Sequence, residues 1–237
     1  MNQEIWMLSV TAASIGFLHT LMGPDHYLPF IMMSKSGQWS LPKTMWVTLV
    51  CGIGHVASSV VLGVVGITLG VAVSKLEALE AYRANWAAWA LILFGFVYLL
   101  WGVYQAVRNQ PHRHVHMHEG GHVHVHTHMH QDTHTHNHNR DNPKKYTPWV
   151  LFTIFVLGPC EPLIPILMYP AARNSVAGLV IVSMIFSFIT IVTMMTIVWI
   201  GTVSSHKLLG SHMERYIHVV SGAAIFLCGI AIQFLGL

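Results

Sequence analysis

Two stretches of the sequence combine metal-ligand side chains with a Gly-Pro pair. The first is Gly23-Pro24-Asp25-His26, which follows His19, and the second is Gly158-Pro159-Cys160-Glu161. Imidazole, carboxylate and thiolate groups are the protein ligands of late first-row divalent metals. Proline interrupts a helix, so the chain can turn here and bring His19 towards His26. In an unbroken helix these two histidines would lie on one face but about 10 Å apart, too far to share one ion.

A third histidine, His55, lies in the next apolar segment, within Gly52-Ile53-Gly54-His55-Val56-Ala57-Ser58-Ser59. The small residues around it allow close helix packing, and its simpler role would be that of a hydrogen-bonded packing residue. Simpler roles also exist for Asp25 as a helix N-cap, for Glu161 as a proton carrier and for Cys160 as a packing residue. The sequence predicts a mixed metal site with nitrogen, oxygen and sulfur ligands. Its candidate ligands are His19, Asp25, His26, His55, Cys160 and Glu161.

A low-complexity tract between residues 112 and 138 holds twelve of the eighteen histidines. Such a segment cannot build a core, and we expect it to be disordered without a ligand. Neutral imidazole binds Zn, Ni, Cu and Fe, so the tract predicts metal collection at several interchangeable sites. The alternative is a spacer. The histidines concerned are His112, His114, His116, His118, His122, His124, His126, His128, His130, His134, His136 and His138.

The composition is typical of an integral membrane protein. Of the 237 residues, 54% are hydrophobic and 9% are charged, and the mean hydropathy is +0.55. A soluble domain is about one-quarter charged. A helix needs about 20 apolar residues to cross a bilayer, which predicts an all-α protein with six transmembrane helices. The stretches of spanning length are 5–33, 44–73, 86–107, 148–171, 176–203 and 216–237. The first has no basic region or cleavage site, and we expect it to be retained.

The first and fourth of these stretches are the interrupted ones, and their Gly-Pro pairs lie 135 residues apart. This spacing predicts an internal repeat, in which Asp25 aligns with Cys160 and His26 with Glu161. Three helices per repeat is an odd number, so the second copy would cross the membrane inverted, with broken helices meeting at a midplane site. The predicted parts are a first repeat at 1–107, a His-rich loop at 108–147 and a second repeat at 148–237. The alternative is two unrelated kinks.

The basic residues are distributed unequally between the predicted loops. Loops around 34–43, 108–147 and 204–215 carry nine Lys and Arg residues, whereas the other side carries Lys75, Arg83 and Arg173. The positive-inside rule then predicts a multi-pass protein of the cell membrane, inner or plasma, with both termini outside and the His-rich loop in the cytoplasm. The basic residues are dispersed, so nucleic acid is not an expected partner.

The pattern His19-x-x-x-Gly23-Pro24-Asp25-His26, followed by Gly54-His55-x-x-Ser58-Ser59, resembles that of the nickel/cobalt transporter families. The likeness is closest to the nickel/cobalt efflux proteins and to the urease-accessory-type and sulfite-exporter-like membrane proteins. It extends over nearly the whole chain, including the His-rich loop. The resemblance implies a role in metal recognition for His19, Asp25 and His26, and for His55.

The second Gly-Pro motif, continued by Pro162, is also similar to that of the transmembrane thiol-disulfide carriers related to the cytochrome c biogenesis protein. Those carriers use one cysteine in each half as a redox pair. Here the first-half counterpart of Cys160 is Asp25, and neither Cys51 nor Cys228 occupies the matching break. A dithiol exchange would therefore lack its second thiol.

These patterns predict a secondary transporter rather than an enzyme. No Gly-x-x-x-x-Gly-Lys-Ser/Thr loop is present, so we expect neither ATP hydrolysis by this chain nor an ATPase subunit. The expected cargo is Ni²⁺ or Co²⁺, then Zn²⁺, with no prosthetic group, and ligand deprotonation would couple transport to protons. A cytoplasmic collector favours export. Uptake, a thiol or electron carrier and a histidine-box di-iron oxidase are the alternatives, and a homo-oligomer in the lipid bilayer is left open.

Overall fold

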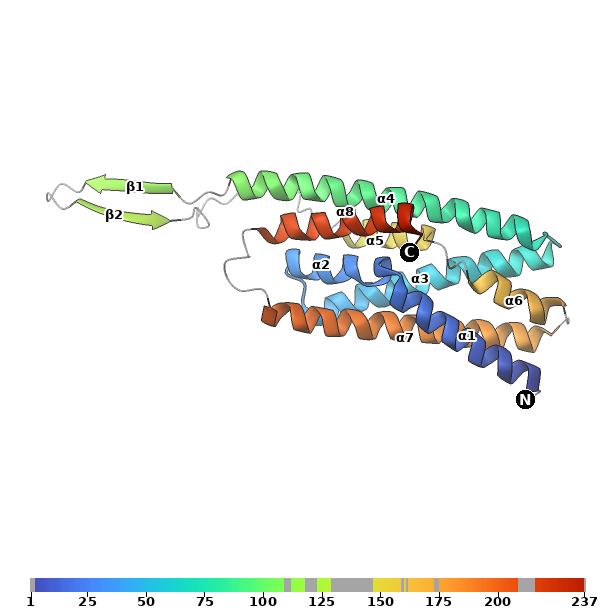
Figure 1. Ribbon diagram of the computed structural model, residues 1–237. Helices are drawn as coiled ribbons and strands as arrows, with labels where there is room; N and C mark the ends of the chain where they lie inside the picture. The colour runs from blue at the N-terminus through green and yellow to red at the C-terminus, as the bar shows by residue number, and fades with distance from the viewer. Residues whose placement is uncertain are drawn as a thin grey trace.

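The computed structural model describes residues 3–108, 112–117, 123–128, 147–158, 160, 162–172, 175–208 and 216–236. Over these ranges the chain forms a helical bundle in which most long helices run roughly along one direction and α1 crosses them obliquely (Figure 1). The helical elements are α1 (Gln3–Met22), the 3-10 helix η1 (Pro24–His26), α2 (Leu28–Ser36), α3 (Leu41–Thr68), α4 (Val73–Arg108), α5 (Thr147–Leu157), α6 (Leu163–Ala172), α7 (Val176–Leu208) and α8 (Ile217–Leu235).

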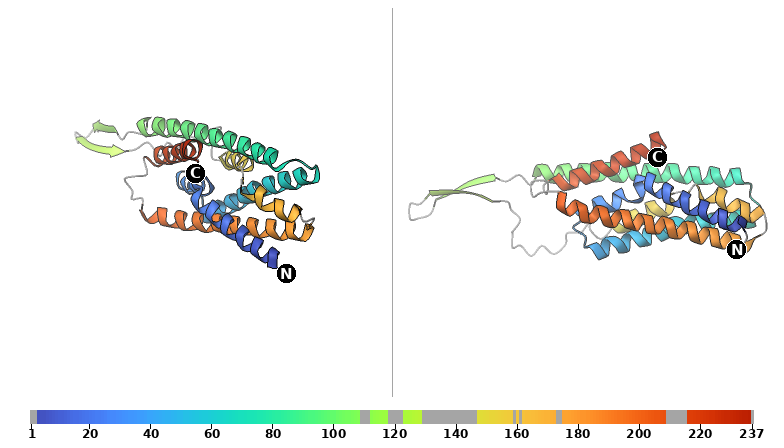
Figure 2. Two further views of the ribbon diagram at one scale, coloured as in Figure 1. Left: turned by 45° about the vertical axis from the view of Figure 1, so that its right-hand side comes forward. Right: turned by 60° about the horizontal axis from the view of Figure 1, so that its bottom comes forward.

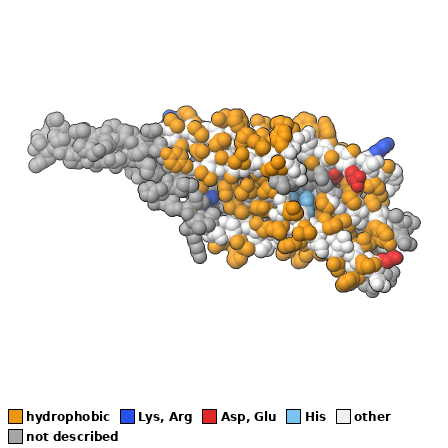
Figure 3. Space-filling model, in the orientation of Figure 1, with side chains coloured by type: hydrophobic (Ala, Val, Ile, Leu, Met, Phe, Trp, Pro, Cys, Tyr) orange, Lys and Arg blue, Asp and Glu red, His pale blue; other side chains and the backbone are white. Residues whose placement is uncertain are grey.

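Five of these helices are long and apolar enough to cross a membrane, and α5 is a shorter apolar helix. The five are α1, α3, α4, α7 and α8. Large hydrophobic side chains are exposed along the bundle, including Leu69, Trp149 and Phe234 at about two-thirds exposure or more. One face of the molecule shows this apolar surface along most of its length, with charged side chains mainly near its ends (Figure 3). The prediction of an all-helical integral membrane fold for these segments is confirmed.

Both interrupted stretches form pairs of consecutive helices rather than single long ones. α1 is followed by η1 and α2, and α5 is followed by α6, with each pair continuing along the bundle in the same general direction (Figures 1 and 2). Pro24 and Pro159 stand at the two interruptions. A proline cannot continue the helical hydrogen-bond ladder, which explains why each helix stops where it does.

The boundaries of α4 correct one part of the sequence interpretation. The prediction placed Arg83 in a loop outside a span that began at residue 86, whereas α4 begins at Val73 and includes Arg83. The stretch Lys75-Leu76-Glu77-Ala78-Leu79-Glu80 consists of good helix formers, so the helix extends beyond the purely apolar segment. Leu76 and Glu80 are buried on its inner side.

The His-rich tract contains two strands, β1 (His112–Met117) and β2 (Val123–His128). They pair antiparallel, with His112 opposite His128 and Met117 opposite Val123. We expect the tract to be disordered without a ligand, whereas the structure describes these two segments as a pair of strands. In β2 histidine alternates with valine and threonine, whose β-branched side chains favour an extended backbone.

α4 and α8 pack closely in antiparallel directions, because each carries two glycines seven residues apart. A Cβ atom at any of the four would meet the backbone of the opposite helix. The glycines and the backbone that each faces are Gly95 with Phe226, Gly102 with His218 and Val219, Gly222 with Leu99, and Gly229 with Ile92. Small residues at a helix interface allow this kind of backbone contact in membranes. The contact is reciprocal, because the glycines of each helix lie against the backbone of the other.

Candidate metal centre

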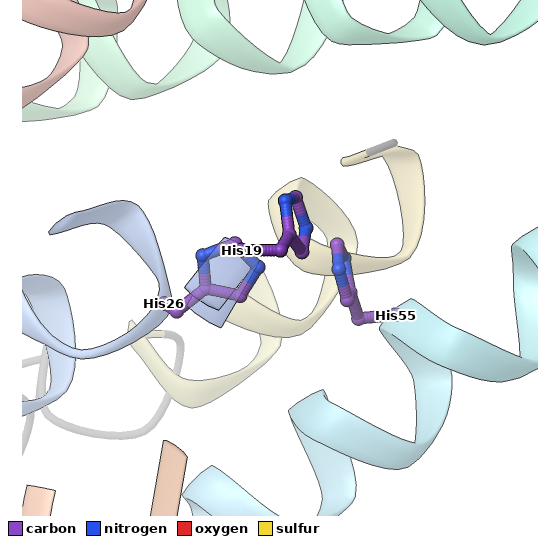
Figure 4. A group of neighbouring side chains, drawn as sticks. All are labelled: His19, His26 and His55. Atoms are coloured by element: carbon purple, nitrogen blue, oxygen red, sulfur yellow. The ribbon is translucent and has the colours of Figure 1, made fainter. Parts of the chain in front are cut away.

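Three histidines from three elements meet inside the bundle. His19 lies near the end of α1, His26 ends η1, and His55 lies in the middle of α3. The ring centroids are 4.8 Å apart for His19 and His26 and 5.0 Å apart for His26 and His55. One ring nitrogen from each histidine lies within 4.8 Å of the other two (Figure 4). Of the groups predicted as ligands, these three are the ones that the structure brings together.

The first break places His26 beside His19. The Gly23 N–H donates to the His19 carbonyl at 3.0 Å, which closes α1, and the His26 N–H donates to the Gly23 carbonyl at 3.1 Å. A Cβ atom at Gly23 would lie 2.5 Å from His26 Nδ1 and 2.8 Å from Asp25 Oδ1. Glycine is therefore required at this position for both side chains to fold back over the turn.

The hydrogen bonds of His26 fix which ring nitrogen carries the proton. Its Nδ1 lies 3.1 Å from the Gly23 carbonyl oxygen and 3.1 Å from Asp25 Oδ1. The carbonyl can only accept, and so can the ionised carboxylate, so Nδ1–H is the donor. In the neutral imidazole this assignment leaves a lone pair on Nε2. The side chain is buried.

His55 has the same arrangement, with a partner from the other half of the chain. Its Nδ1 lies 3.3 Å from the Phe155 carbonyl oxygen near the end of α5, so Nδ1–H donates and the Nε2 lone pair is available. Gly54 lets the two helices approach, because a Cβ atom there would lie 2.8 Å from Val156 Cγ2 and 3.0 Å from Phe152 Cε2. The second break is thus held against the first-half histidine.

The Nε2 atoms of all three histidines are buried and have no hydrogen-bond partner among the described residues. Neutral imidazoles oriented by a hydrogen bond on the other nitrogen are the usual form of histidine metal ligands. Nitrogen ligands of one tetrahedral ion lie about 3.4 Å apart for a metal–nitrogen distance of about 2.1 Å. Small side-chain rotations from the present spacing would reach that geometry.

Asp25 lies next to this group rather than in it. Its Oδ1 contacts His26 Nδ1 at 3.1 Å, and its side chain is about one-third exposed. A carboxylate in this place orients the imidazole and makes it a better electron donor to a metal. The N-cap alternative for Asp25 does not hold, because Tyr27 is the N-cap residue of α2.

Cys160 and Glu161 are placed differently from the histidines. Cys160 is buried, and its side chain belongs to a cluster with Ala12, Leu163 and Phe186. Its backbone N–H donates to Ser59 Oγ at 3.2 Å, one turn along α3 from His55. Cys160 lies outside the group of three ring nitrogens. Glu161, Pro159 and the histidines at 118, 122, 130, 134, 136 and 138 lie outside the described residues.

The sequence interpretation missed an ion pair next to this centre. In α4, Arg83 Nη1 lies 2.6 Å from Glu80 Oε1, and Glu80 is 1% exposed. Arg83 also donates to the Ser58 hydroxyl and to two carbonyl oxygens at the end of α5. The available signal was the Glu-x-x-Arg spacing, which suits one helix face, next to a run of helix formers.

Comparison with known proteins identifies one family model, described as cytochrome c biogenesis protein transmembrane region, which matches residues 28–231. No curated protein and no solved structure matches the chain. The match includes His55 and Cys160 and begins after His19, Asp25 and His26. It supports the likeness to the thiol-disulfide carriers, whereas the nickel/cobalt transporter families are not supported.

Proposed function

We propose that this chain, which belongs to the family of the cytochrome c biogenesis protein transmembrane region, transports a divalent transition-metal ion, because imidazoles from α1, η1 and α3 converge next to its first break. The observation that carries the proposal is the convergence of His19, His26 and His55, whose three buried Nε2 atoms have no hydrogen-bond partner within the part of the chain that the structure describes. Leaving a buried polar atom unpaired costs about 1–3 kcal/mol, and a single ion would satisfy all three.

The donor set favours Ni²⁺, Co²⁺ or Zn²⁺ over Mg²⁺ or Ca²⁺. The hard alkaline-earth ions prefer oxygen ligands, whereas imidazole suits the late first-row metals. Asp25 adds one negative charge next to His26, which partly balances the charge of a divalent ion. Three neutral imidazoles would bind the ion without a thiolate ligand. Such ligands can release the ion again.

The architecture supports alternating access. We propose that α1 with α2 and α5 with α6 form two equivalent broken spans, so that six spans make an inverted repeat around the centre. The reciprocal glycine contact of α4 and α8 supports this symmetry, since these are the third helices of the two halves. In the proposed orientation both termini are outside, and the His-rich tract collects the ion in the cytoplasm.

We propose that metal transport is coupled to the exchange of protons. The proposed direction of transport is export from the cytoplasm. A protonated imidazole cannot bind a metal, so the ion and protons compete for the same nitrogen atoms. An ion that leaves towards one side is then replaced by protons from that side. The metal content of cells with and without the chain decides between export, which lowers it, and uptake, which raises it.

The test is metal flux into vesicles that contain the purified full chain and an internal chelating dye. We expect Ni²⁺, Co²⁺ or Zn²⁺ to enter faster than into empty vesicles, and His26→Ala to abolish the difference. His218→Gln is the matched control, because it removes a histidine of α8 that hydrogen-bonds Tyr98. Equal rates with empty vesicles, or full activity of His26→Ala, would contradict the proposal.

The second candidate is a thiol or electron carrier, which the family and the position of Cys160 at the second break favour. The described residues include Cys51, Cys160 and Cys228, and Cys160 lies in a different buried cluster from the other two. Cys160→Ala separates the two functions. Metal flux should persist in this variant, whereas transfer of reducing equivalents across the vesicle membrane would be lost if the chain were a thiol carrier.

A further inference from the structure

The first half of the chain supplies donors to several carbonyl groups at the end of α5. Arg83 Nη2 donates to the Val156 carbonyl at 2.8 Å and to the Gly158 carbonyl at 3.4 Å. His55 Nδ1 donates to the Phe155 carbonyl. The last carbonyls of a helix have no partner within the helix, and a cation there also interacts favourably with the helix dipole.

Arg83 is also bonded to the serines that follow His55 in α3. Its Nη2 donates to Ser58 Oγ at 2.7 Å, and Ser58 Oγ in turn donates to the His55 carbonyl at 2.8 Å. Its Nη1 lies 3.5 Å from Ser59 Oγ, which accepts the backbone N–H of Cys160. One guanidinium therefore connects α4, α3 and both sides of the second break.

Glu80 holds the guanidinium in this position. The pair is close, at 2.6 Å, and Glu80 is buried while Arg83 is 17% exposed. Arginine presents several donors in a fixed plane, so one side chain can satisfy a carboxylate, a hydroxyl and two carbonyls together. A buried charged residue in a helix of membrane-spanning length is costly and indicates a role beyond filling space.

From these contacts we propose that Arg83, oriented by Glu80, is a positioning residue that closes the second break, which must open and close again for each ion carried. This inference rests on the proposed transport function. His55 is one of the three histidines of the centre, and its Nδ1 is bonded to the Phe155 carbonyl at the end of α5. An ion on its Nε2 would therefore act on the same end of α5 that Arg83 holds. Movement of α5 away from α4 would break the bonds of Arg83 to Val156 and Gly158.

The state of the break can be measured directly through Cys160, which is buried beside it. In a Cys51→Ala, Cys228→Ala background, maleimide labelling of the purified chain reports how often the segment opens. We expect Arg83→Gln to label about tenfold faster, because its charge-assisted bonds to the α5 carbonyls are lost. Arg83→Lys keeps the charge but not the planar set of donors, and its rate should lie between the two.

Flux and binding separate positioning from a general structural role. In Arg83→Gln, Ni²⁺ binding by the histidines should stay within about threefold, while maximal flux falls about tenfold, since the ligands remain but the break no longer closes. Arg83→Lys should recover part of the flux. If Arg83→Gln does not fold, Arg83→Lys and Glu80→Gln provide the same comparison.

Slow Cys160 labelling together with unchanged flux in Arg83→Gln would overturn the positioning role. Slow labelling with reduced flux would overturn it as well, because the break would still be closed. If the wild-type chain neither binds nor moves Ni²⁺, Co²⁺ or Zn²⁺, the transport function fails. The labelling comparison then still decides whether Arg83 holds the break.

Discussion

Replacing Gly23 with alanine tests the metal centre without removing any ligand. The added Cβ atom would lie 2.5 Å from His26 Nδ1 and 2.8 Å from Asp25 Oδ1. The backbone of Gly23 has φ −84° and ψ 99°, an extended conformation that suits any residue before a proline. The substitution therefore acts through the neighbouring side chains and not through backbone strain.

The size of the effect follows from the distances. Non-bonded heavy atoms pack at about 3.5 Å, so the His26 ring must retreat by about 1 Å. Metal–ligand distances tolerate deviations of only about 0.2 Å, so the displaced ring would no longer serve as a ligand in the same site. Losing an outer partner of a ligand costs about 10–100-fold in affinity, and displacing the ligand itself should cost at least as much.

The assay is equilibrium Ni²⁺ binding in detergent to the purified chain that lacks residues 112–138, because the histidines of that tract would bind Ni²⁺ as well, together with its melting temperature. Gly63→Ala is the matched control, because Gly63 is also buried and its Cβ would meet only Leu167 Cδ1, the movable end of a side chain, at 3.2 Å. We expect Gly63→Ala to bind normally and Gly23→Ala to bind at least tenfold more weakly at a similar melting temperature. Normal binding by Gly23→Ala would refute the role of His26 as a ligand.

Three further predictions follow from the same geometry. Asp25→Asn should weaken Ni²⁺ binding by about 10–100-fold in calorimetric titration, because it removes the charged partner of His26 Nδ1, and unchanged affinity would contradict the role of Asp25 in orienting the ring. Deleting residues 112–138 should slow flux mainly at low metal concentration, since the deletion removes collection and leaves the centre; complete loss at saturating metal would mean that the tract is part of the essential site. Ni²⁺ affinity should fall as the pH is lowered, because protons compete for the imidazoles, and binding should release protons into a weakly buffered solution; pH-independent binding would argue against imidazole ligands.

Local chemistry was enough to predict the imidazole part of the centre. The Gly23-Pro24 pair lies between His19 and His26 and implies a turn that brings the two histidines together. Their ring centroids are 4.8 Å apart. The place of His55 depended on the small residues around it, which allow α3 to approach α5. In both cases the pattern reflects a physical requirement that acts over a few residues.

The roles of Asp25, Cys160 and Arg83 could not be predicted in the same way. A rotation of the Asp25 side chain decides whether its carboxylate contacts a metal or the neighbouring imidazole. The spacing of residues in the sequence does not determine that rotation. Cys160 aligns with Asp25, yet the fold buries its side chain among apolar residues. A hydropathy window ends a span at the first charges, so it separated Arg83 from the helix to which it belongs.

The reciprocal glycines of α4 and α8 bear on how such a chain could have arisen. A helix face that fits the same face of an oppositely directed helix is the self-complementary surface that two-fold related subunits share. In the α4–α8 contact, each helix has two glycines seven residues apart, and each of these glycines lies against the backbone of the other helix. A single half, inserted into the membrane in both orientations, could therefore have paired with its own copy before gene duplication and fusion joined the two. In the proposed inverted repeat, such a fusion would leave the halves free to diverge, with histidines at one break and a cysteine at the other.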